Sequence, residues 1–283
     1  MPELAVLEER LRSLGRVVVA FSGGADSAFL AWVANRTLGP DACGVATAVS
    51  PSLAGDERDD CAALAAEWGL RWREVPTTEL DDLAYVANDG DRCARCKTAL
   101  MDVLGPLAET DGATVVLGVN LDDLGDHRPG QRAASERGAA FPLVDAGFTK
   151  DDVRSWSRRL GLRTWDKPAA ACLASRVPYG TPVTVAVLSR VERAEAAIRR
   201  LGFPALRVRH YGDTARIEVP VDELGALLAQ REPVVAAVRA AGYQYVTVDL
   251  EGLRSGNLNS ALSSSPSSAD AGTSPHCGDG HVS

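Results

Sequence analysis

The stretch 22–27, which reads Ser-Gly-Gly-Ala-Asp-Ser, holds the residues whose types and spacing best suit chemistry. It follows a β-branched run at 17–19 and precedes an apolar helical pattern, so it is predicted to turn from a strand into a helix. The N–H groups of such a turn bind anions, and glycines let the backbone approach a ligand closely. The serines add hydroxyl donors, and the aspartate suits either a Mg²⁺ ion or the helix N-cap. The candidate binding residues are Ser22, Gly23, Gly24, Asp26 and Ser27.

This turn resembles the PP-loop of ATP pyrophosphatases, which cleave ATP between the α- and β-phosphates and hold the pyrophosphate. It lacks the Gly-Lys-Ser/Thr ending of a Walker A loop and the third spaced glycine of the dinucleotide-binding motif. The resemblance implies an ATP site. The alternative is a glycine-rich turn that binds no ligand.

Three of the six cysteines lie neither on core positions nor in the Ser-rich tail, which holds Cys277. Cys93 and Cys96 open a predicted helix among basic residues, a setting that lowers a thiol pKa, so both are predicted to be thiolates near neutral pH. Cys172 lies in the connection between the two halves of the chain. This spacing permits a zinc site short of one ligand, a redox pair, an iron–sulfur cluster with three protein ligands, or thiols without a special role. Cys43 and Cys61, in contrast, are predicted to be core residues.

Alternating strands and helices are expected in the first part of the chain. The strands are predicted at about 16–21, 42–48, 71–75 and 114–118, and the helices at about 26–37, 55–68 and 94–107. This order predicts an α/β fold with a doubly wound parallel sheet and a site at the carboxyl ends of its strands. Gly118 would lie at that edge with the 22–27 turn. Thr149 and Asp152 resemble a capping box at the start of a helix over 149–160.

The polar segment 122–140 shows no periodicity and is predicted to be a lid or disordered. After a break at Lys167-Pro168, the pattern changes. It predicts a helix at 184–201, strands at 205–210 and 214–219, a helix at 221–241 and a strand at 244–249. These elements indicate a small α+β domain with an antiparallel three-stranded sheet.

The composition and net charge of the chain disfavour some classes of partner. The net charge of −8 disfavours nucleic acid and membrane surfaces as partners. No apolar run approaches the ~20 residues of a membrane span, and the first residues lack the apolar core of a secretion signal. A cytoplasmic enzyme is therefore expected.

Several further motifs occur in order between about residues 3 and 262. They are Arg92-Cys93-x-x-Cys96-Lys97, Gly118-x-Asn120-x-Asp122-Asp123 with Arg128-Pro129-Gly130, Ala171-Cys172-Leu173-Ala174-Ser175-Arg176, Gly202-Phe203-Pro204 with Arg207-Val208-Arg209, Ala215-Arg216-Ile217-Glu218, and Tyr245-Val246-Thr247-Val248-Asp249-Leu250 leading to Arg254-Ser255-Gly256. Together with the 22–27 turn, they resemble the LarE family of ATP-dependent sulfur transferases, which insert sulfur during assembly of the nickel-pincer nucleotide cofactor. His127 departs from the pattern, since relatives often have an aromatic residue there.

The resemblance implies a domain organisation and an activation step. The expected domains are a PP-loop ATP pyrophosphatase domain at 1–168, an α+β substrate or oligomerisation domain at 169–255, and a disordered Ser-rich tail at 256–283. A carboxylate of a pyridinium dicarboxylate mononucleotide would attack the α-phosphate of ATP, giving an acyl-adenylate and pyrophosphate. The 22–27 turn, with Asp26 and Mg²⁺, would hold the pyrophosphate, while Gly118 and the loop 120–130 would close over the nucleotide.

The resemblance leaves two sulfur donors open. In some members, a cysteine in the motif of Cys172 forms a thioester, and cleavage of its Cβ–S bond leaves dehydroalanine in the protein. Other members hold a [4Fe-4S] cluster on three cysteines and donate a sulfide bound to its fourth iron. Cys93, Cys96 and Cys172 fit that version, which we favour because the first would leave Cys93 and Cys96 without a role.

Other matched positions imply substrate and metal contacts. Arg176, Arg207 and Arg209 match residues near a phosphate and carboxylate site, and Arg176 is counted with the cysteines as catalytic. Glu195 and Glu218 match acids that can bind a metal. A solvated strand face is the alternative for Arg207 and Arg209. The resemblance also implies a small phosphorylated carboxylate as substrate and a homo-oligomer.

Three rival functions share some of these features. A tRNA-thiolating PP-loop enzyme would need a basic RNA-binding surface or an added domain, and neither is visible in this sequence. A nucleotide-binding regulatory protein without chemistry would not need the intact turn and the clustered cysteines. A sulfur transferase of specialised metabolism, acting on another carboxylate, is compatible with the sequence.

Overall fold

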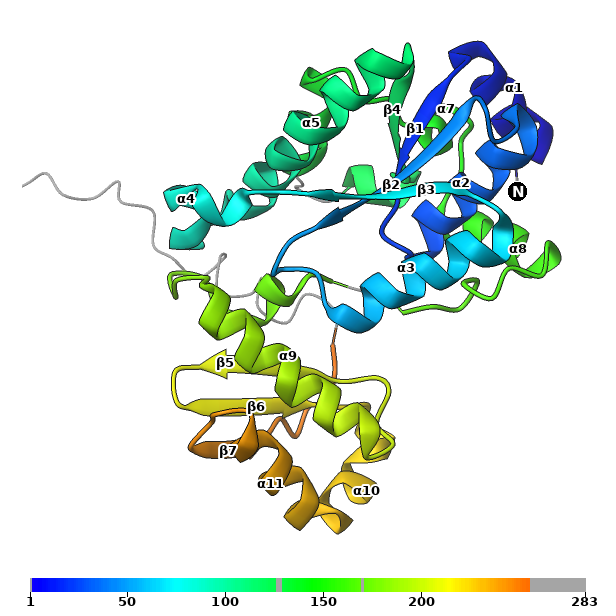
Figure 1. Cartoon of the computed structure of the whole chain (residues 1–283). Coiled ribbons are helices and arrows are strands. Elements are labelled where there is room, and N and C mark those ends of the chain that lie inside the picture. The colour runs from blue at the N-terminus through cyan, green and yellow to red at the C-terminus, as the bar shows by residue number, and fades with distance from the viewer. Residues whose placement is uncertain (1, 126–128, 169–170, 255–283) are drawn as a thin grey trace, which may run out of the picture.

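A four-stranded parallel sheet forms the centre of the first part of the chain (Figure 1). The computed structural model describes residues 2–125, 129–168 and 171–254. The strands lie in the order β3-β2-β1-β4. They are β1 (Val17–Ala20), β2 (Cys43–Val49), β3 (Arg71–Pro76) and β4 (Thr114–Leu117).

Helices cover both faces of this sheet, because side chains along a strand alternate between its two faces. Val17 and Val19 of β1 pack in one apolar cluster with residues of α1, α2, α3 and α8, whereas Val18 packs with residues of α5. The helices of the described part are α1 (Leu4–Leu14), α2 (Ala25–Leu38), α3 (Gly55–Trp68), α4 (Leu83–Ala87), α5 (Arg92–Asp111), α6 (Pro129–Glu136), α7 (Pro142–Asp145) and α8 (Lys150–Arg159). Short 3-10 turns add η1 (Glu79–Asp81), η2 (Leu121–Gly125) and η3 (Leu173–Arg176). Figure 1 shows α5 on the opposite side of the sheet from α1, α2 and α8, so the predicted doubly wound α/β fold is confirmed.

Two predictions made from local sequence are confirmed. Thr149 and Asp152 form a capping box at α8, in which the Thr149 Oγ1 accepts from the Asp152 N–H and Asp152 accepts from the Thr149 N–H. Cys43 and Cys61 are fully buried in the cluster between the sheet and α2.

The segment 122–140 is more regular than predicted. It contains most of η2 and all of α6, and Ala134 of α6 is buried beside α5. The sequence signal was weak because α6 presents little apolar surface of its own and packs against a longer helix. His127 lies outside the described residues.

A second, three-stranded sheet follows in the order β5-β6-β7. Its strands are β5 (Arg207–Tyr211), β6 (Thr214–Glu218) and β7 (Tyr245–Val248). The prediction of an antiparallel sheet is wrong for β7, since β5 and β6 are antiparallel but β6 and β7 are parallel. A parallel pair needs a long crossover, and the helices between β6 and β7 supply it.

The single helix predicted over 221–241 is divided. It consists of the turn η4 (Val221–Glu223), α10 (Leu224–Ala229) and α11 (Arg231–Ala240), with Gln230 between the two helices. Pro233 explains the break, because proline has no N–H to continue the helical ladder and is tolerated in a first turn. The long helix α9 (Val185–Arg200) packs on this second sheet.

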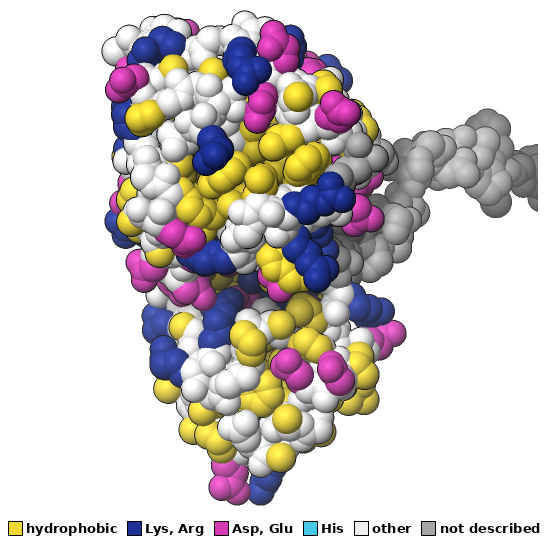
Figure 2. All heavy atoms as spheres, turned by 90° about the vertical axis from the view of Figure 1, so that its right-hand side faces the viewer, with side chains coloured by type: hydrophobic (Ala, Val, Ile, Leu, Met, Phe, Trp, Pro, Cys, Tyr) yellow, Lys and Arg dark blue, Asp and Glu magenta, His cyan; other side chains and the backbone are white. Residues whose placement is uncertain are grey.

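The start of α3 joins the two parts. The Gly55 N–H donates to Glu192 of α9 at 2.7 Å, and Arg199 of α9 pairs with Asp56 at 2.7 Å. Figure 2 shows Lys and Arg side chains gathered at the waist between the two parts.

The domain boundary after residue 168 stays a prediction, and the predicted tail at 256–283 lies outside the described residues. None of the described helices is both long and apolar enough to cross a membrane.

Replacement of Gly118 tests how closely the chain after β4 approaches the backbone of the 22–27 turn. A Cβ at Gly118 would lie 2.8 Å from the Ser27 nitrogen and 2.9 Å from the Asp26 carbonyl carbon. Both are backbone atoms, so Gly118→Ala should lower the free energy of unfolding by about 1–3 kcal/mol. Urea unfolding measures the change. Gly225→Ala on α10, where a Cβ meets nothing within 4 Å, is the control and should leave stability unchanged or slightly higher. Equal stability of both variants would contradict the close approach.

Candidate functional site

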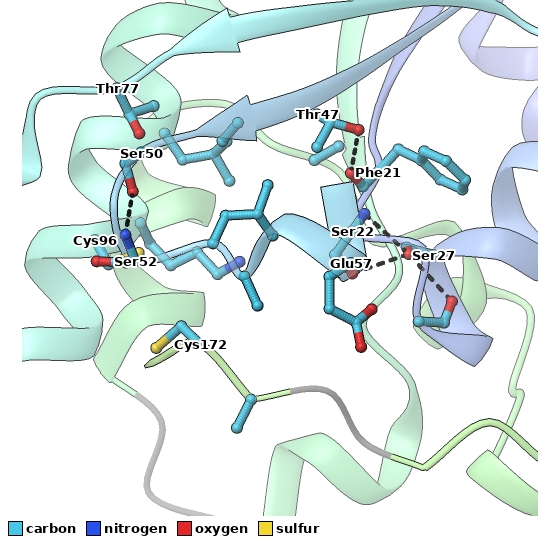
Figure 3. A pocket seen from close by; sticks show the side chains of 18 of the residues that line it. Phe21, Ser22, Ser27, Thr47, Ser50, Ser52, Glu57, Thr77, Cys96 and Cys172 are labelled. Carbon is cyan, nitrogen blue, oxygen red and sulfur yellow. Dashed lines mark hydrogen bonds between the residues drawn. The ribbon is translucent and has the colours of Figure 1, made fainter. Parts of the chain in front are cut away.

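A cavity of about 360 Å³ opens beyond the carboxyl ends of β1, β2 and β4. Its lining extends from the 22–27 turn to the segment that carries Cys172. Figure 3 shows Ser22 and Ser27 toward one end and Cys96 and Cys172 toward the other. The cavity therefore brings the 22–27 turn and two thiols into one space, as the fold rule for parallel sheets leads one to expect.

The 22–27 turn is shaped by its own hydroxyl groups. The Ser22 N–H donates to the Ser27 Oγ at 3.2 Å, and the Ser27 Oγ donates to the Gly24 carbonyl at 3.2 Å. Gly23 has a φ of 68°, a left-handed conformation that glycine adopts without strain. No side chain caps α2, which begins at Ala25, so its first N–H groups stay available to an anion.

Asp26 lies in the first turn of α2 and is not its N-cap, because Gly24 takes that position. The N-cap alternative for Asp26 is therefore wrong. The Asn120 Nδ2 donates to the Asp26 Oδ1 at 3.1 Å. Burial raises the pKa of Asp26, and this hydrogen bond and the nearby Lys150 oppose the rise. A Mg²⁺ ligand role for Asp26 stays a prediction.

Lys167 stands next to this turn and was not recognised from the sequence. Its Nζ lies 2.8 Å from Glu57 and 2.7 Å from Asp60, and 3.6 Å from where a Cβ of Gly23 would be. Burial alone would lower the pKa of Lys167, but hydrogen bonds to the two carboxylates outweigh it and raise the pKa. A charged ammonium group therefore stays beside the turn. In the sequence, Lys167 is only a lysine before a proline, and no motif marks it as a site residue.

The structure places two of the three candidate cysteines in the cavity wall and the third outside it. Cys96 and Cys172 line the cavity, whereas Cys93 is exposed and is not part of that lining. No group of three or more His, Cys, Asp or Glu among the described residues is arranged to hold a metal ion. A [4Fe-4S] cluster on Cys93, Cys96 and Cys172 stays a prediction.

The prediction that Cys96 is a thiolate near neutral pH is wrong. Burial, then the neighbouring Cys172, raises the pKa of Cys96 to about 12, and Lys97 offsets only part of the rise. Cys96 packs against the apolar cluster that contains Tyr85 and Leu173. Cys96 points inward from α5, so burial outweighs the basic residues around it in setting its pKa. The direction in which it points depends on tertiary packing.

Three arginines hold the turn that carries Cys172. Arg176 donates to the carbonyls of Ala171 at 2.6 Å and of Cys172 itself at 3.3 Å. Arg92 donates to the carbonyl of Ala174 at 2.9 Å, and Arg209 donates to that of Ser175 at 2.8 Å. Arg176 thus acts on the backbone of the candidate nucleophile, in addition to lining the cavity.

Two buried carboxylates anchor these arginines. Glu195 is fully buried and accepts from Arg176 at 2.8 and 3.1 Å, from Arg199 at 3.0 Å and from the Val208 N–H at 2.9 Å. Glu218 is fully buried and accepts from Arg209 at 2.9 Å and from Arg216 at 3.1 Å. Their oxygens are engaged by arginines in this structure, so the predicted metal role would require those contacts to break.

Arg207 and Arg209 are not on a solvated strand face. Arg209 is 2% exposed, and Arg207 is half-buried and donates to the Arg254 carbonyl at 3.3 Å. Burial lowers the pKa of Arg207, and the positive charges of Arg209 and Arg176 lower it further. Three guanidinium groups are therefore close together, an arrangement that suits an anion such as a phosphate.

Glu79 is a further cavity residue that sequence reasoning missed. It lies in η1 just beyond β3, is 4% exposed and accepts a hydrogen bond from the Ser50 Oγ. Nothing in its surroundings along the chain singled it out.

Comparisons with known proteins give close matches over nearly the whole chain. No family model matches. The chain is 44% identical over 263 residues to an uncharacterised protein of Synechocystis, covering 92% of this chain and 98% of that protein. It is 38% identical over 259 residues to the pyridinium-3,5-bisthiocarboxylic acid mononucleotide synthase of Lactiplantibacillus plantarum, covering 91% and 94%. It is 25% identical over 250 residues to an uncharacterised protein of Methanocaldococcus jannaschii, covering 88% and 94%.

The reactivity of the thiols tests the burial of Cys96. In the metal-free protein, iodoacetamide should modify the exposed Cys93 near pH 7 much faster than Cys96. The rate at Cys96 should rise about tenfold for each pH unit up to its pKa, since only the thiolate reacts. Peptide mass spectrometry measures the modified fraction at each cysteine. Equal rates for Cys93 and Cys96 near pH 7 would show that Cys96 is not buried as described.

The ion pair of Arg176 and Glu195 can be tested through stability. Glu195→Ala leaves a buried arginine without its carboxylate, so the free energy of unfolding should fall by about 3–5 kcal/mol. The double replacement Arg176→Met with Glu195→Leu removes both charges and should be clearly less destabilising. Chemical denaturation compares the two variants. A double variant that is less stable than Glu195→Ala would contradict this account.

Proposed function

Because the chain belongs to the LarE family of sulfur transferases, we propose that it adenylates a carboxylate of a pyridinium dicarboxylate mononucleotide with ATP and converts it to a thiocarboxylate. The observation that carries the proposal is a cavity that holds the 22–27 turn at one end and Cys172 at the other (Figure 3). The synthase of Lactiplantibacillus plantarum, named for a bisthiocarboxylic acid mononucleotide, supports the choice of substrate.

In the first step, a carboxylate oxygen of the substrate attacks the α-phosphorus of ATP. The bond from that phosphorus to the bridging oxygen of the β-phosphate breaks, and pyrophosphate leaves. The N–H groups at the start of α2 and the hydroxyl groups of Ser22 and Ser27 would stabilise the negative charge that develops on the pyrophosphate. Lys167, charged and beside Gly23, is in a position to add a cation there. A Mg²⁺ ion bound with ATP would neutralise further charge, and Asp26, within the turn, would be a ligand for it.

The phosphate of the mononucleotide would bind at the arginine cluster. The half-buried Arg207 lies beside Arg176 and Arg209 next to the Cys172 turn, and buried carboxylates hold the latter two in place. Guanidinium groups bind phosphate through paired hydrogen bonds. This arrangement would orient the carboxylates of the substrate toward the cavity.

In the second step, the Cys172 thiolate attacks the acyl carbon, and AMP leaves. The product is a thioester between Cys172 and the substrate. Loss of the Cα proton of Cys172 and cleavage of its Cβ–S bond then yields the thiocarboxylate and dehydroalanine. The sequence favoured a cluster-bound sulfide as donor; the choice of Cys172 here is supported by its place in the cavity lining, which Cys93 does not share.

Replacement of Cys172 separates the two steps. Cys172→Ala should abolish thiocarboxylate formation while leaving pyrophosphate release within about twofold of the wild type, because the alanine removes only the sulfur. A coupled phosphate assay and mass spectrometry of the nucleotide measure the two products. The intact protein should lose the mass of H₂S after one turnover.

Cys93→Ala is the matched control and should still transfer sulfur once. Loss of sulfur transfer in this control, with a visible absorption band in the anaerobically purified protein, would favour the cluster instead. Loss of pyrophosphate release in Cys172→Ala would contradict the role given to this thiol. Absence of pyrophosphate release by the wild type with ATP and the dicarboxylate mononucleotide would contradict the function itself.

A further inference from the structure

The carboxylate of Glu79 has an unusual position in the cavity wall. It is 4% exposed, and one oxygen accepts from the Ser50 Oγ. The other oxygen, Oε2, is buried without a hydrogen-bond partner. No ion pair formed by the described residues involves Glu79, although Lys97 lines the same cavity. Burial of a carboxylate with an unpaired oxygen is costly unless a ligand compensates it.

Contacts place this carboxylate at the thiol end of the cavity. Ser50, its partner, accepts from the Ser52 N–H at 3.1 Å. The carbonyl of Ser52 in turn accepts from the N–H of Leu173, the residue after Cys172, at 2.9 Å. The charge of Glu79 also contributes to the raised pKa of Cys96. A group that reacts with Cys172 would therefore lie near Glu79.

The unpaired oxygen restricts what can bind beside it. A second carboxylate or a phosphate would be repelled by it. A neutral hydroxyl or amine would donate one hydrogen bond but would not balance the charge. A ring that carries a positive charge compensates the carboxylate and still brings its acyl group to the thiol, since the reacting carbon is bonded directly to that ring.

We propose that Glu79 recognises the positive charge of the pyridinium ring of the substrate and so selects a cationic ring over a neutral ring of the same shape. The inference rests on the proposed function, because it names the feature of the proposed substrate, the charge of its ring, that Glu79 recognises. Glu79 is a specificity residue in this account, and the sulfur chemistry stays with Cys172.

Calorimetry with two matched ligands tests the proposal. The first is pyridinium-3,5-dicarboxylate mononucleotide, and the second is the benzene-3,5-dicarboxylate C-riboside 5′-phosphate, which has the same carboxylates and phosphate but a neutral ring. Each is titrated into the full chain in the presence of α,β-methylene-ATP, which is not cleaved. The wild type should bind the cationic ligand at least about tenfold more tightly, a difference of ~1.4 kcal/mol. Glu79→Gln keeps the acceptor for Ser50 and should bring this ratio close to one while leaving the neutral ligand unaffected.

The control variant is Glu74→Gln, which removes the same charge from β3, where Glu74 pairs with Arg58 outside the cavity. It should keep the wild-type ratio, and the thermal unfolding of both variants should match the wild type. Equal weakening of both ligands by Glu79→Gln would overturn the proposal in favour of a structural role. Weakened binding of the ATP analogue alone would overturn it in favour of a contact to the nucleotide. If the wild type binds neither ligand and releases no pyrophosphate, the proposed function fails together with the inference.

Discussion

The position of Cys172 depends on buried arginines that bind the carbonyl groups around it. Four carbonyls of the turn 171–175 accept from Arg92, Arg176 or Arg209. Arg176 ends η3 itself, whereas Arg92 comes from α5 and Arg209 from β5, so the turn is held at the point where those elements meet. Glu195 and Glu218 keep two of the guanidinium groups in place. Buried ion pairs of this kind contribute little net stability, but breaking one is costly, which makes the geometry of the turn hard to change.

This arrangement links the second part of the chain to the chemistry of the first. Glu195 lies on α9 and also accepts from the N–H of Val208 in β5. Arg209 of β5 donates to Glu218 of β6, its diagonal neighbour in the antiparallel pair. The second sheet therefore acts on the cavity through the Cys172 turn, while the parallel sheet supplies the 22–27 turn. A reaction that uses both ends of the cavity therefore requires the two parts of the chain to keep their relative position.

Charge is distributed unevenly along the cavity. At the loop end, the N–H groups at the start of α2 lie beside Lys167, which pairs with Glu57 and Asp60, and at the other end three guanidinium groups lie beside the Cys172 turn. At this same thiol end, burial raises the pKa of Cys96, and the buried carboxylate of Glu79 lies near the thiols. In the proposed function, the loop end takes the pyrophosphate of ATP and the arginines take the phosphate of the substrate, so the cationic pyridinium ring would lie beside Glu79. Complementarity of this kind contributes more to specificity than to affinity.

The sequence alone determined the features that local chemistry controls. The 22–27 turn, the strands of the parallel sheet, the capping box at Thr149 and the core positions of Cys43 and Cys61 follow from periodicity, glycine placement and short-range hydrogen bonds. The tertiary structure decided the rest. Cys96 is protonated because α5 turns it inward, Glu195 and Glu218 bind arginines because α9, β5 and β6 meet there, and β7 is parallel because two helices carry the chain across. Lys167 and Glu79 reach the cavity from segments with no motif of their own. Long-range packing sets burial and charge partners, and no local pattern encodes either.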